Sequence, residues 1–389
     1  MSRILTEEQQ HWCDVIGEFA KKEIEPIMLD WDKVTDPSKA IPFDAYAKAF
    51  KLGLNAFEIP KEYGGSKVDL ATAAVMYEEM GYYDGNFASV MQTTNLALKP
   101  VLIGGTPEQV QYFSKHILEG KGYACFCLTE PQSGSDASNV KTTAVKDGDD
   151  WILNGSKCFI TNGDTASTYT VLAVTDRAKG YRGMTMFVVE KGMPGFSTGV
   201  HEKKMGIRGS STTDLIFEDV RVPDANRLGK VGQGWQVVMH TLNGARAGVA
   251  AQALGIGEGA LDLAMKYVQE RMQFKKKLSK FQRTQFEIAD MHTKLEAGKL
   301  LVYSAACKED AYNKGDKTQN YAMDSAMAKL FCGEAASDVT RRCVQLFGGY
   351  GYIREYQVER MMRDAKITEI YEGTSEAQRM VISGQLGIK

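Results

Sequence analysis

Residues 123–136 read YACFCLTEPQSGSD, and they mark the point where the character of the chain changes. Before this stretch, apolar residues recur at the three-to-four-residue spacing of one helix face. From residue 123 to residue 222 they fall in short β-rich runs, with turn signals at Asp147-Gly148 and Asn154-Gly155. Beyond Gly232 the helical spacing returns. This order predicts a multi-domain α and β protein: a helical N-terminal domain (1–120), a small middle β-domain (121–232) and a C-terminal four-helix bundle (233–389).

The recurrence of apolar residues also gives approximate positions for the elements. In the first domain we expect helices around 12–19, 45–54, 71–80 and 110–117. In the middle domain we expect strands at 123–128, 141–145, 151–153, 169–175, 184–190 and 214–222. In the last domain we expect helices at 244–259, 261–271, 282–308, 321–348 and 376–386.

The composition excludes several classes of protein. The 389 residues are 43% hydrophobic and 25% charged, which is typical of a globular chain and not of a disordered or collagenous one. A formal net charge of -2 provides no bulk positive field for nucleic acid or anionic lipid. The N-terminus has no signal-peptide core, and no run reaches the roughly 18 apolar residues of a membrane span. We therefore expect a cytoplasmic protein with no nucleic-acid partner and no membrane span.

The seven cysteines indicate free thiols. Their number is odd and they are scattered along a long chain, as in a reducing compartment. Only Cys125 and Cys127 lie close together, and no second pair or histidine cluster completes a zinc site. The sequence also has no GxxxxGKS/T phosphate loop and no HExxH, and Gly232-Gln233-Gly234 lacks the third glycine of a dinucleotide fingerprint. We expect neither a metal nor a nicotinamide site.

Two segments of the β region can approach a flat ligand. Segment 126–136 runs from an apolar strand into glycine and hydroxyl residues, which let backbone N–H groups come close to a ligand. A plain turn explains the same composition. Segment 154–163, NGSKCFITNG, places an aromatic and a hydroxyl residue on the next β element, where a ring can cover a cofactor. A hairpin with a core phenylalanine is the alternative.

Carboxylates cluster near the C-terminus in segment 364–376, DAKITEIYEGTSE. Ser375 and Gln378 have the spacing of a capping box, so Glu376 is expected in the first turn of the last helix. Glu372 precedes Gly373 and the cap, and lies off any helical face. A carboxylate on such a turn can project into a cleft and act as a base, with a raised pKa if the cleft is dry. A solvated loop glutamate is the alternative interpretation.

Taken together, these segments resemble the acyl-CoA dehydrogenase family of flavoenzymes over essentially the whole chain. The similarity to short-chain (butyryl-CoA type) members is closest, particularly over 248–259 and 367–376. Six ordered motifs carry the resemblance: 60–65 (PKEYGG), 128–136 (LTEPQSGSD), 159–163 (FITNG), 271–274 (RMQF), 345–351 (QLFGGYG) and 363–374 (RDAKITEIYEGT).

The resemblance implies non-covalent FAD, a homotetramer, and oxidation of an acyl-CoA thioester to the 2-enoyl-CoA, with an electron-transferring flavoprotein as electron acceptor. It implies that Glu372 takes the α-proton while flavin N5 accepts hydride from the β-carbon. The Glu372 backbone N–H and a ribityl hydroxyl of FAD would stabilise the charge on the thioester oxygen.

By the same resemblance, the cofactor-binding positions form two groups. The first lies in the β-domain and after the base: Phe126, Leu128, Thr129, Gly134, Ser135, Phe159, Ile160, Thr161, Thr374 and Glu376. The second would contact the FAD of a neighbouring subunit: Arg271, Phe274, Gln282, Gln345, Gly348 and Gly349. The substrate would contact Ser135, Asn243, Arg246, Tyr371 and Gly373, with Asn243 and Arg246 at its CoA portion.

The sequence departs from the family pattern in several places. Phe159 stands where tryptophan is common, residues 275–277 (KKK) replace a glycine-lysine-proline type of turn, and Asn243 replaces a common aspartate. Ala245 occupies the place where some relatives carry their base, so no glutamate there competes with Glu372.

The acyl group and the direction of the reaction stay open. Segment 91–95, MQTTN, aligns with the wall of the family's acyl pocket and is unusually polar, although a capped helix start also explains it. It contains no arginine, which disfavours a dicarboxylyl-CoA. The same scaffold can work mainly as an enoyl-CoA reductase, or on a branched or alicyclic acyl-CoA. A non-catalytic subunit that binds acyl-CoA or transfers electrons is the non-enzymatic alternative.

Overall fold

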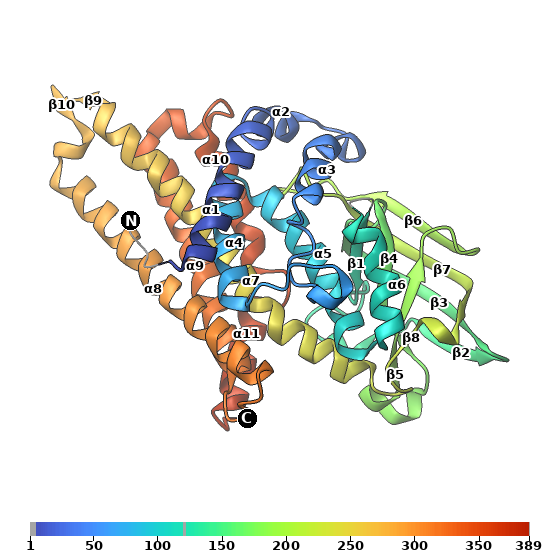
Figure 1. Cartoon of the computed structure of the whole chain (residues 1–389). Coiled ribbons are helices and arrows are strands. Elements are labelled where there is room, and N and C mark those ends of the chain that lie inside the picture. Colours follow the sequence, from blue (N-terminus) through green and yellow to red (C-terminus); the bar gives the residue numbers. More distant parts are fainter. Residues whose placement is uncertain (1–4, 120–121, 389) are drawn as a thin grey trace.

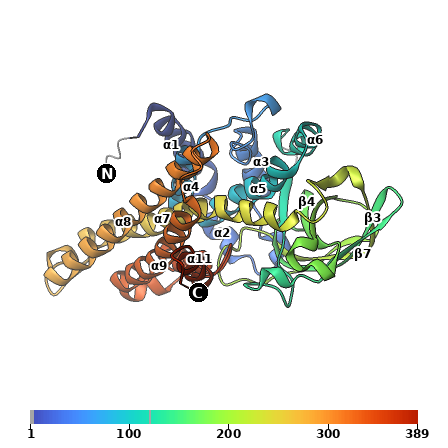
Figure 2. The same cartoon turned by 90° about the horizontal axis from the view of Figure 1, so that it is seen from below.

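The computed structural model describes residues 5–119 and 122–388. Figure 1 shows a β-sheet at one end of the molecule, long helices at the other, and the N-terminal helices between them. Figure 2 shows three long helices, α7 (Gly234–Glu270), α8 (Gln282–Asn313) and α9 (Tyr321–Phe347), extending away from the sheet. The predicted order of helical, β and helical parts is confirmed. The predicted boundary between residues 120 and 121 lies outside the described residues.

The N-terminal part consists of α1 (Glu7–Phe19), α2 (Met28–Lys33), α3 (Phe43–Lys51), α4 (Leu70–Tyr83), α5 (Gly85–Gly104) and α6 (Pro107–Leu118). Helices α1, α3, α4 and α6 confirm the predicted segments. Periodicity misses α5, because this helix is buried on almost every side and has no polar face. The reading of 91–95 as a capped helix start is wrong, because α5 begins at Gly85, where Asp84 accepts a hydrogen bond from the Phe87 N–H (2.8 Å).

The middle part is an eight-stranded sheet with the order β6-β7-β3-β2-β4-β5-β8 and with β1 parallel to β4. Its strands are β1 (Tyr123–Cys127), β2 (Thr143–Asp147), β3 (Asp150–Thr161), β4 (Ala166–Val174), β5 (Met184–Glu190), β6 (Phe196–His201), β7 (Thr212–Pro223) and β8 (Arg227–Leu228). The turn at Asp147-Gly148 is confirmed. The turn predicted at Asn154-Gly155 is wrong, because β3 runs through these residues and absorbs the irregularity as a bulge against β7.

The C-terminal part consists of α7 (Gly234–Glu270), α8 (Gln282–Asn313), α9 (Tyr321–Phe347), α10 (Gln357–Ala365) and α11 (Ser375–Gln385). The two segments predicted at 244–259 and 261–271 are one helix of 37 residues, α7. Its small residues allow close packing on α4: a Cβ at Gly255 would lie 2.0 Å from the carbonyl oxygen of Glu78. Glycine is therefore required at that crossing.

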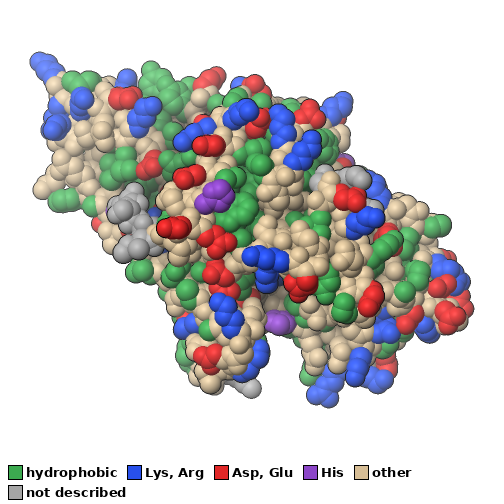
Figure 3. Space-filling model, in the orientation of Figure 1, with side chains coloured by type: hydrophobic (Ala, Val, Ile, Leu, Met, Phe, Trp, Pro, Cys, Tyr) green, Lys and Arg blue, Asp and Glu red, His purple; other side chains and the backbone are tan. Residues whose placement is uncertain are grey.

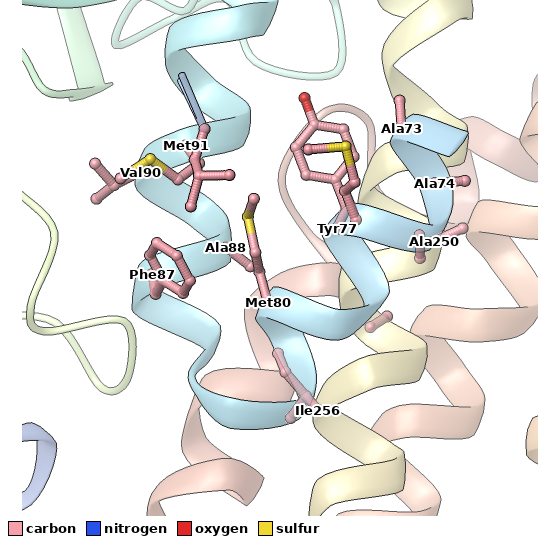
Figure 4. Close-up of a cluster of buried hydrophobic side chains, with 14 of the residues drawn as sticks. Ala73, Ala74, Tyr77, Met80, Phe87, Ala88, Val90, Met91, Ala250 and Ile256 are labelled. Atoms are coloured by element: carbon pink, nitrogen blue, oxygen red, sulfur yellow. The ribbon is translucent and has the colours of Figure 1, made fainter. Parts of the chain in front are cut away.

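An apolar core fills the space where α4, α5 and α7 meet. Figure 4 shows side chains from all three helices converging there: Ala73, Ala74, Tyr77, Met80, Phe87, Ala88, Val90, Met91, Ala250 and Ile256. The Tyr77 ring lies in this cluster, and its hydroxyl points away from Met80. This core holds the N-terminal helices against the bundle and forms the floor of the site described below.

A buried ionic cluster of Asp84, Arg360 and Asp364, which we call the interdomain lock, joins the three parts. Arg360 Nη1 lies 2.5 Å from Asp84 Oδ2 and 3.3 Å from Asp364 Oδ2, and all three side chains are buried. Asp84 caps α5, and Asp364 belongs to α10. Asp364 also accepts a hydrogen bond from the N–H of Ile207, between β6 and β7 (2.6 Å). One arginine therefore connects a helix of each helical part with a loop of the sheet.

The surface carries charges of both signs. On the face in Figure 3, acidic and basic side chains are interspersed, and Lys and Arg gather at the end that carries the short hairpin β9 (Met272–Gln273) and β10 (Lys276–Lys277). Within residues 5–119 and 122–388, no helix is both long and apolar enough to cross a membrane.

Candidate active site

Glu372 lies on a tight turn between a 3₁₀ segment (Lys366–Glu369) and α11. Its φ is 53° and that of Gly373 is 98°, so two successive residues adopt the left-handed conformation. Glycine accepts this geometry freely, whereas a glutamate in it stores roughly 1–3 kcal/mol of strain. The prediction that Glu372 lies off any helical face is confirmed. Its N–H donates to no residue in the described part of the chain.

Two side chains hold this turn in place. Lys329 Nζ of α9 donates to the Gly373 carbonyl (2.6 Å), and Gln378 Nε2 of α11 donates to the same oxygen (2.8 Å) and to the Glu372 carbonyl (3.4 Å). The predicted capping box is wrong: Thr374, not Ser375, caps α11 by accepting from the Ala377 N–H (3.2 Å). The capping box does not form because the Gln378 amide donates to the Gly373 and Glu372 carbonyls instead.

The Glu372 side chain is half-buried, and part of its carboxylate is kept from water. Its Oε2 atom is buried and has no hydrogen-bond partner among the described residues. Burial raises the pKa of Glu372 to about 7, although the positive charges of Lys99, Lys329 and Arg246 oppose this rise. A base is most effective when its pKa lies near the working pH, so this environment suits proton abstraction. A solvated loop glutamate is therefore not what the structure contains.

The neighbouring Tyr371 connects the turn to two helices. Its hydroxyl donates to Gln252 Oε1 on α7, and the Gln252 amide donates to the Gly85 carbonyl at the start of α5 (3.0 Å). Burial raises the pKa of Tyr371 well above its usual value, so the phenol stays protonated. Tyr371 thus fixes the position of the following glutamate.

Asn243 and Arg246 lie one turn apart on α7. Arg246 Nη1 donates to Asn243 Oδ1 (2.6 Å), and the buried Arg246 Nε has no partner among residues 5–119 and 122–388. Burial lowers the pKa of Arg246, and the charge of Glu372 opposes that shift. The two predicted substrate positions are therefore brought close to the base, and Arg246 keeps one donor available.

A narrow pocket lies between α4, α5, α7 and α8 beside this turn. Ala245 forms part of its wall with a buried methyl group, so α7 offers no carboxylate there. Five polar side chains, which we call the pocket cluster, also line it: Glu58, Tyr77, Gln92, Lys99 and Glu309. The charges of Lys99 and Glu58 both act on the pKa of Glu372, so the pocket and the base are neighbours.

In the β-domain, Phe159 is exposed over 64% of its side chain and has a φ of 57° at an irregularity of β3. This exposure contradicts the alternative of a core phenylalanine. Thr129 and Thr161 are half-buried, and the Cys158 N–H donates to the Thr129 carbonyl (2.9 Å). The other predicted positions divide by exposure: Gly134 and Ser135 are exposed, Phe126 is half-buried, and Leu128 and Ile160 are buried.

A buried ion pair between Glu130 and Lys157 stabilises the conformation of the 128–136 loop. Glu130 accepts from Lys157 Nζ (2.8 Å), from the Thr142 hydroxyl (2.6 Å) and from the Lys141 N–H (2.6 Å). Burial opposes ionisation of Glu130, but Lys157 and these hydrogen bonds outweigh it and lower its pKa. The loop is thus built around an internal ion pair and is more than a plain turn.

The second predicted group lies at the far end of the bundle. Arg271 follows α7 directly and its guanidinium lies 5.2 Å from the centre of the Tyr350 ring. A cavity of about 490 Å³ is lined there by Arg271, Gly348 and Gly349. Phe274, Gln282 and Gln345 are exposed. Figure 1 places this end opposite the sheet, so a single chain does not bring the two groups of predicted cofactor positions together.

Thr374 and Glu376 complete the predicted positions at the N-terminus of α11. Thr374 is half-buried, and Glu376 is exposed. Hydrogen bonds from its own backbone N–H and from Thr374 lower the pKa of Glu376. The expected place of Glu376 in the first turn of the last helix is confirmed.

Sequence reasoning missed the buried lysines that shape the site. Lys329 is 1% exposed, and burial lowers its pKa to about 8 while Glu372 opposes the shift. It stands among small apolar residues of α9, and a charged residue on an apolar helix face was the available signal. Lys157 is likewise buried, and Lys99 is half-buried within an apolar stretch of α5.

Comparison with family models gives three matches in order along the chain. Residues 6–121 match the N-terminal domain of acyl-CoA dehydrogenases, residues 125–220 the middle domain, and residues 232–387 the C-terminal domain. Together they span nearly all of the chain.

Individual proteins agree with these matches. The chain is 44% identical to a short-chain specific acyl-CoA dehydrogenase of Clostridium acetobutylicum, covering 98% of both chains. It is 44% identical to a subunit of the caffeyl-CoA reductase-Etf complex of Acetobacterium woodii, covering 95% of both. The solved structure of butyryl-CoA dehydrogenase from Megasphaera elsdenii has a TM-score of 0.93 at 42% identity, covering 99% of this chain and 100% of that one.

Proposed function

This chain belongs to the acyl-CoA dehydrogenase family of FAD-dependent oxidoreductases, and from that membership we propose that it interconverts a short-chain, small branched or small cyclic acyl-CoA and its 2-enoyl-CoA, with Glu372 as the base. The observation that carries the assignment of the base is the Glu372 carboxylate, whose buried Oε2 has no hydrogen-bond partner among the described residues, beside a pocket to which α7 contributes no carboxylate.

The residues of the chain fit FAD. Phe159 and Thr161 lie at the end of β3, and Thr129 lies next to them because its carbonyl accepts from the Cys158 N–H (2.9 Å). A Cβ at Gly134 would meet no atom within 4 Å. Bound there, FAD supplies the acceptor for the hydride that leaves the β-carbon. Thr129, Ser135, Phe159 and Thr161 would hold it, supported by the Glu130–Lys157 ion pair beneath the loop.

Glu372 takes the α-proton of the thioester on its unpaired Oε2. The Lys329 and Gln378 hydrogen bonds to the Gly373 carbonyl keep the carboxylate in place, which is what proton abstraction from a weak carbon acid requires. The free N–H of Glu372 can donate to the thioester oxygen and stabilise its developing charge. Asn243 and Arg246, close to this turn, bind the CoA portion.

The cofactor site is completed by a second copy of the chain. Arg271, Gly348 and Gly349 lie at the end of the molecule opposite the sheet, so they can reach only the FAD of another subunit. The guanidinium of Arg271 suits a pyrophosphate, which it can bind through two parallel hydrogen bonds. A homotetramer satisfies this requirement in every copy, because closed symmetry gives each site the same partner surface.

The electron partner in this proposal is an electron-transferring flavoprotein, supported by the Acetobacterium woodii relative, which is named as part of a complex with one. The same relative is named as a reductase, so net reduction of an enoyl-CoA is the second candidate function. The redox potential of the holoenzyme with bound substrate discriminates the two directions. A non-catalytic subunit would not need the hydrogen bonds from Lys329 and Gln378 that orient the Glu372 turn.

A turnover screen tests the proposal. Purified holoprotein is offered short, branched and cyclic acyl-CoAs with an artificial electron acceptor, and the matching enoyl-CoAs with a reduced donor. Turnover of at least one thioester, lost in Glu372→Gln, supports the proposal. A colourless preparation, or holoprotein that turns over no thioester in either direction, contradicts it.

A further inference from the structure

Two polar atoms in the pocket have no partner. Gln92 of α5 and Glu309 of α8 are each 5% exposed, and both line the pocket. Gln92 Nε2 and Glu309 Oε2 are buried, and neither atom forms a hydrogen bond in the described part of the chain. Folded proteins pair nearly all buried polar atoms, so two exceptions in one pocket indicate that a ligand brings the missing partners.

The unpaired groups face the same short stretch of α7. A Cβ at Gly248 would lie 2.9 Å from Gln92 Nε2, and one at Gly244 would collide with Glu309 Oε1. Gly244 and Gly248 are one helical turn apart, about 6 Å. Both side chains therefore reach into one small region next to Ala245.

Three members of the pocket cluster, Glu58, Tyr77 and Lys99, already pair with one another. Lys99 Nζ lies 3.0 Å from Glu58 Oε2 and donates to the Gly244 carbonyl (2.9 Å). The Tyr77 hydroxyl donates to Glu58 Oε1 (2.9 Å). Burial raises the pKa of Glu309 to about 7. What the pocket lacks is a neutral group that both donates and accepts a hydrogen bond, which describes a hydroxyl.

We infer that this pocket selects an acyl group that carries a hydroxyl on its distal part over one that ends in a plain alkyl group. The inference rests on the proposed function, because the distal end of an acyl chain held at Glu372 would reach this neighbouring pocket. Gln92 belongs to the polar segment 91–95, so the inference also gives that segment a role.

The free space of the pocket, about 20 Å³, suits one small group. A water molecule needs roughly 10–15 Å³, so in the free protein one water can bridge the two unpaired atoms. A substrate hydroxyl that displaces this water reproduces its hydrogen bonds, whereas a methyl group leaves the amide and the carboxyl unpaired. Sites built in this way reject the analogue without the hydroxyl by large factors, up to about 10⁴–10⁵.

The test compares matched thioesters on the FAD-loaded wild-type protein: butyryl-CoA with 4-hydroxybutyryl-CoA, and pentanoyl-CoA with 5-hydroxypentanoyl-CoA. We expect at least one hydroxylated member to exceed its plain counterpart by about tenfold or more in kcat/KM. Affinity is measured separately by titrating the same thioesters into Glu372→Gln holoprotein, where the ratio of dissociation constants should favour the same member.

A variant connects the preference to the residue. Gln92→Met removes the unpaired donor while keeping the side-chain length, and it is expected to fold because it deletes a buried unpaired amide. The preference for the hydroxylated thioester should fall by about tenfold. Ser114→Ala on α6 is the matched control: its Oγ is also buried and unpaired but lies outside the pocket, so the preference should not change.

The outcomes separate the two proposals. Equal or better use of the plain thioesters by the wild-type protein overturns the inference and leaves the proposed function standing, as does a preference that persists in Gln92→Met. A preference for glutaryl-CoA, with its terminal carboxylate, also overturns it. Absence of turnover with every thioester overturns the proposed function itself.

Discussion

The interdomain lock and the pocket cluster are both buried sets of charged side chains at the meeting of the N-terminal helices with the bundle, and they differ in completeness. In the lock, both carboxylates have an ionic partner and a backbone N–H, and only the Nε–H of Arg360 lacks an acceptor. Around the pocket, Glu309 and Glu372 each keep a carboxylate oxygen without a partner.

The difference does not lie in the pKa shifts. Burial raises the pKa of Asp364 in the lock to about 6, and those of Glu309 and Glu372 to about 7. What separates the two regions is whether the protein itself supplies the hydrogen-bond partners. A buried cluster whose hydrogen bonds are nearly all formed within the protein, which we call saturated, stabilises the fold. An unsaturated cluster keeps unpaired polar atoms that a ligand can pair with.

The largest expected effect is on the unsaturated side. Glu372→Gln keeps the shape of the side chain and removes the base, so reduction of the enzyme by acyl-CoA should slow by about 10⁴-fold or more. FAD should remain bound and substrate should still perturb its spectrum. Anaerobic stopped-flow absorbance measures the bleaching rate.

The control for this variant adds a base from the other side of the pocket. Ala245→Glu in the Glu372→Gln background should restore part of the bleaching if α7 faces the α-carbon. Glu309→Gln should bleach far faster than Glu372→Gln. Bleaching of Glu372→Gln near the wild-type rate would falsify the assignment of the base.

On the saturated side, the effect should appear in stability. Arg360→Met leaves Asp84 and Asp364 buried without their cation, which costs about 3–5 kcal/mol of unfolding free energy. Denaturant titration of the holoprotein measures the loss. Arg221→Met is the control: Arg221 pairs with Asp147 and Asp150 on the surface, so its removal should change the free energy of unfolding far less. Equal losses in the two variants would mean that the lock does not hold the domains.

Arg271 belongs to neither the interdomain lock nor the pocket cluster. On the proposed assignment, its anionic partner is the FAD of another subunit. On that assignment, Arg271→Ala removes a bidentate ligand of the FAD pyrophosphate. A charge-assisted hydrogen bond is worth about 1.5–3 kcal/mol, so FAD retention should weaken by roughly 10–100-fold. Flavin absorbance after gel filtration measures it. Arg283→Ala is the control, because this arginine pairs with Glu287 on the exposed side of α8. Full flavin occupancy in Arg271→Ala contradicts the role across subunits.

The smallest change that we expect is in the pH dependence of kcat/KM. The base must be deprotonated, so kcat/KM should rise with pH through about 7. Lys329 lowers the pKa of Glu372, so Lys329→Met should raise that pKa and move the rising limb to higher pH. Lys294→Met, on the α8–α9 surface beside Asp338, should leave the limb in place. A limb that does not move in Lys329→Met would give Lys329 a structural role only.

The sequence was sufficient for whatever depends on periodicity or on a motif. The change of spacing at residue 123 located the sheet, and the 363–374 motif located Glu372. Apolar periodicity did not detect α5, because this helix has no solvent-exposed face. It also did not show that α7 continues across its small residues. The polar character of 91–95 was visible, but Glu309, which lines the same pocket as Gln92, lies more than 200 positions away along the chain. Such long-range meetings depend on packing, which a local pattern does not contain.

Helix α7 has a consequence for how this chain tolerates change. Asn243 and Arg246 lie near its start and Arg271 directly after its end, so on the proposed assignment one unbroken helix carries a substrate contact of one active site and a cofactor contact of another. Arg246 and Arg271 are 25 positions apart, or about 37 Å at 1.5 Å per residue. Inserting one residue between them would turn the far end by about 100°. Away from the Gly255 crossing, residues of this stretch can therefore be exchanged during evolution, but their number cannot drift.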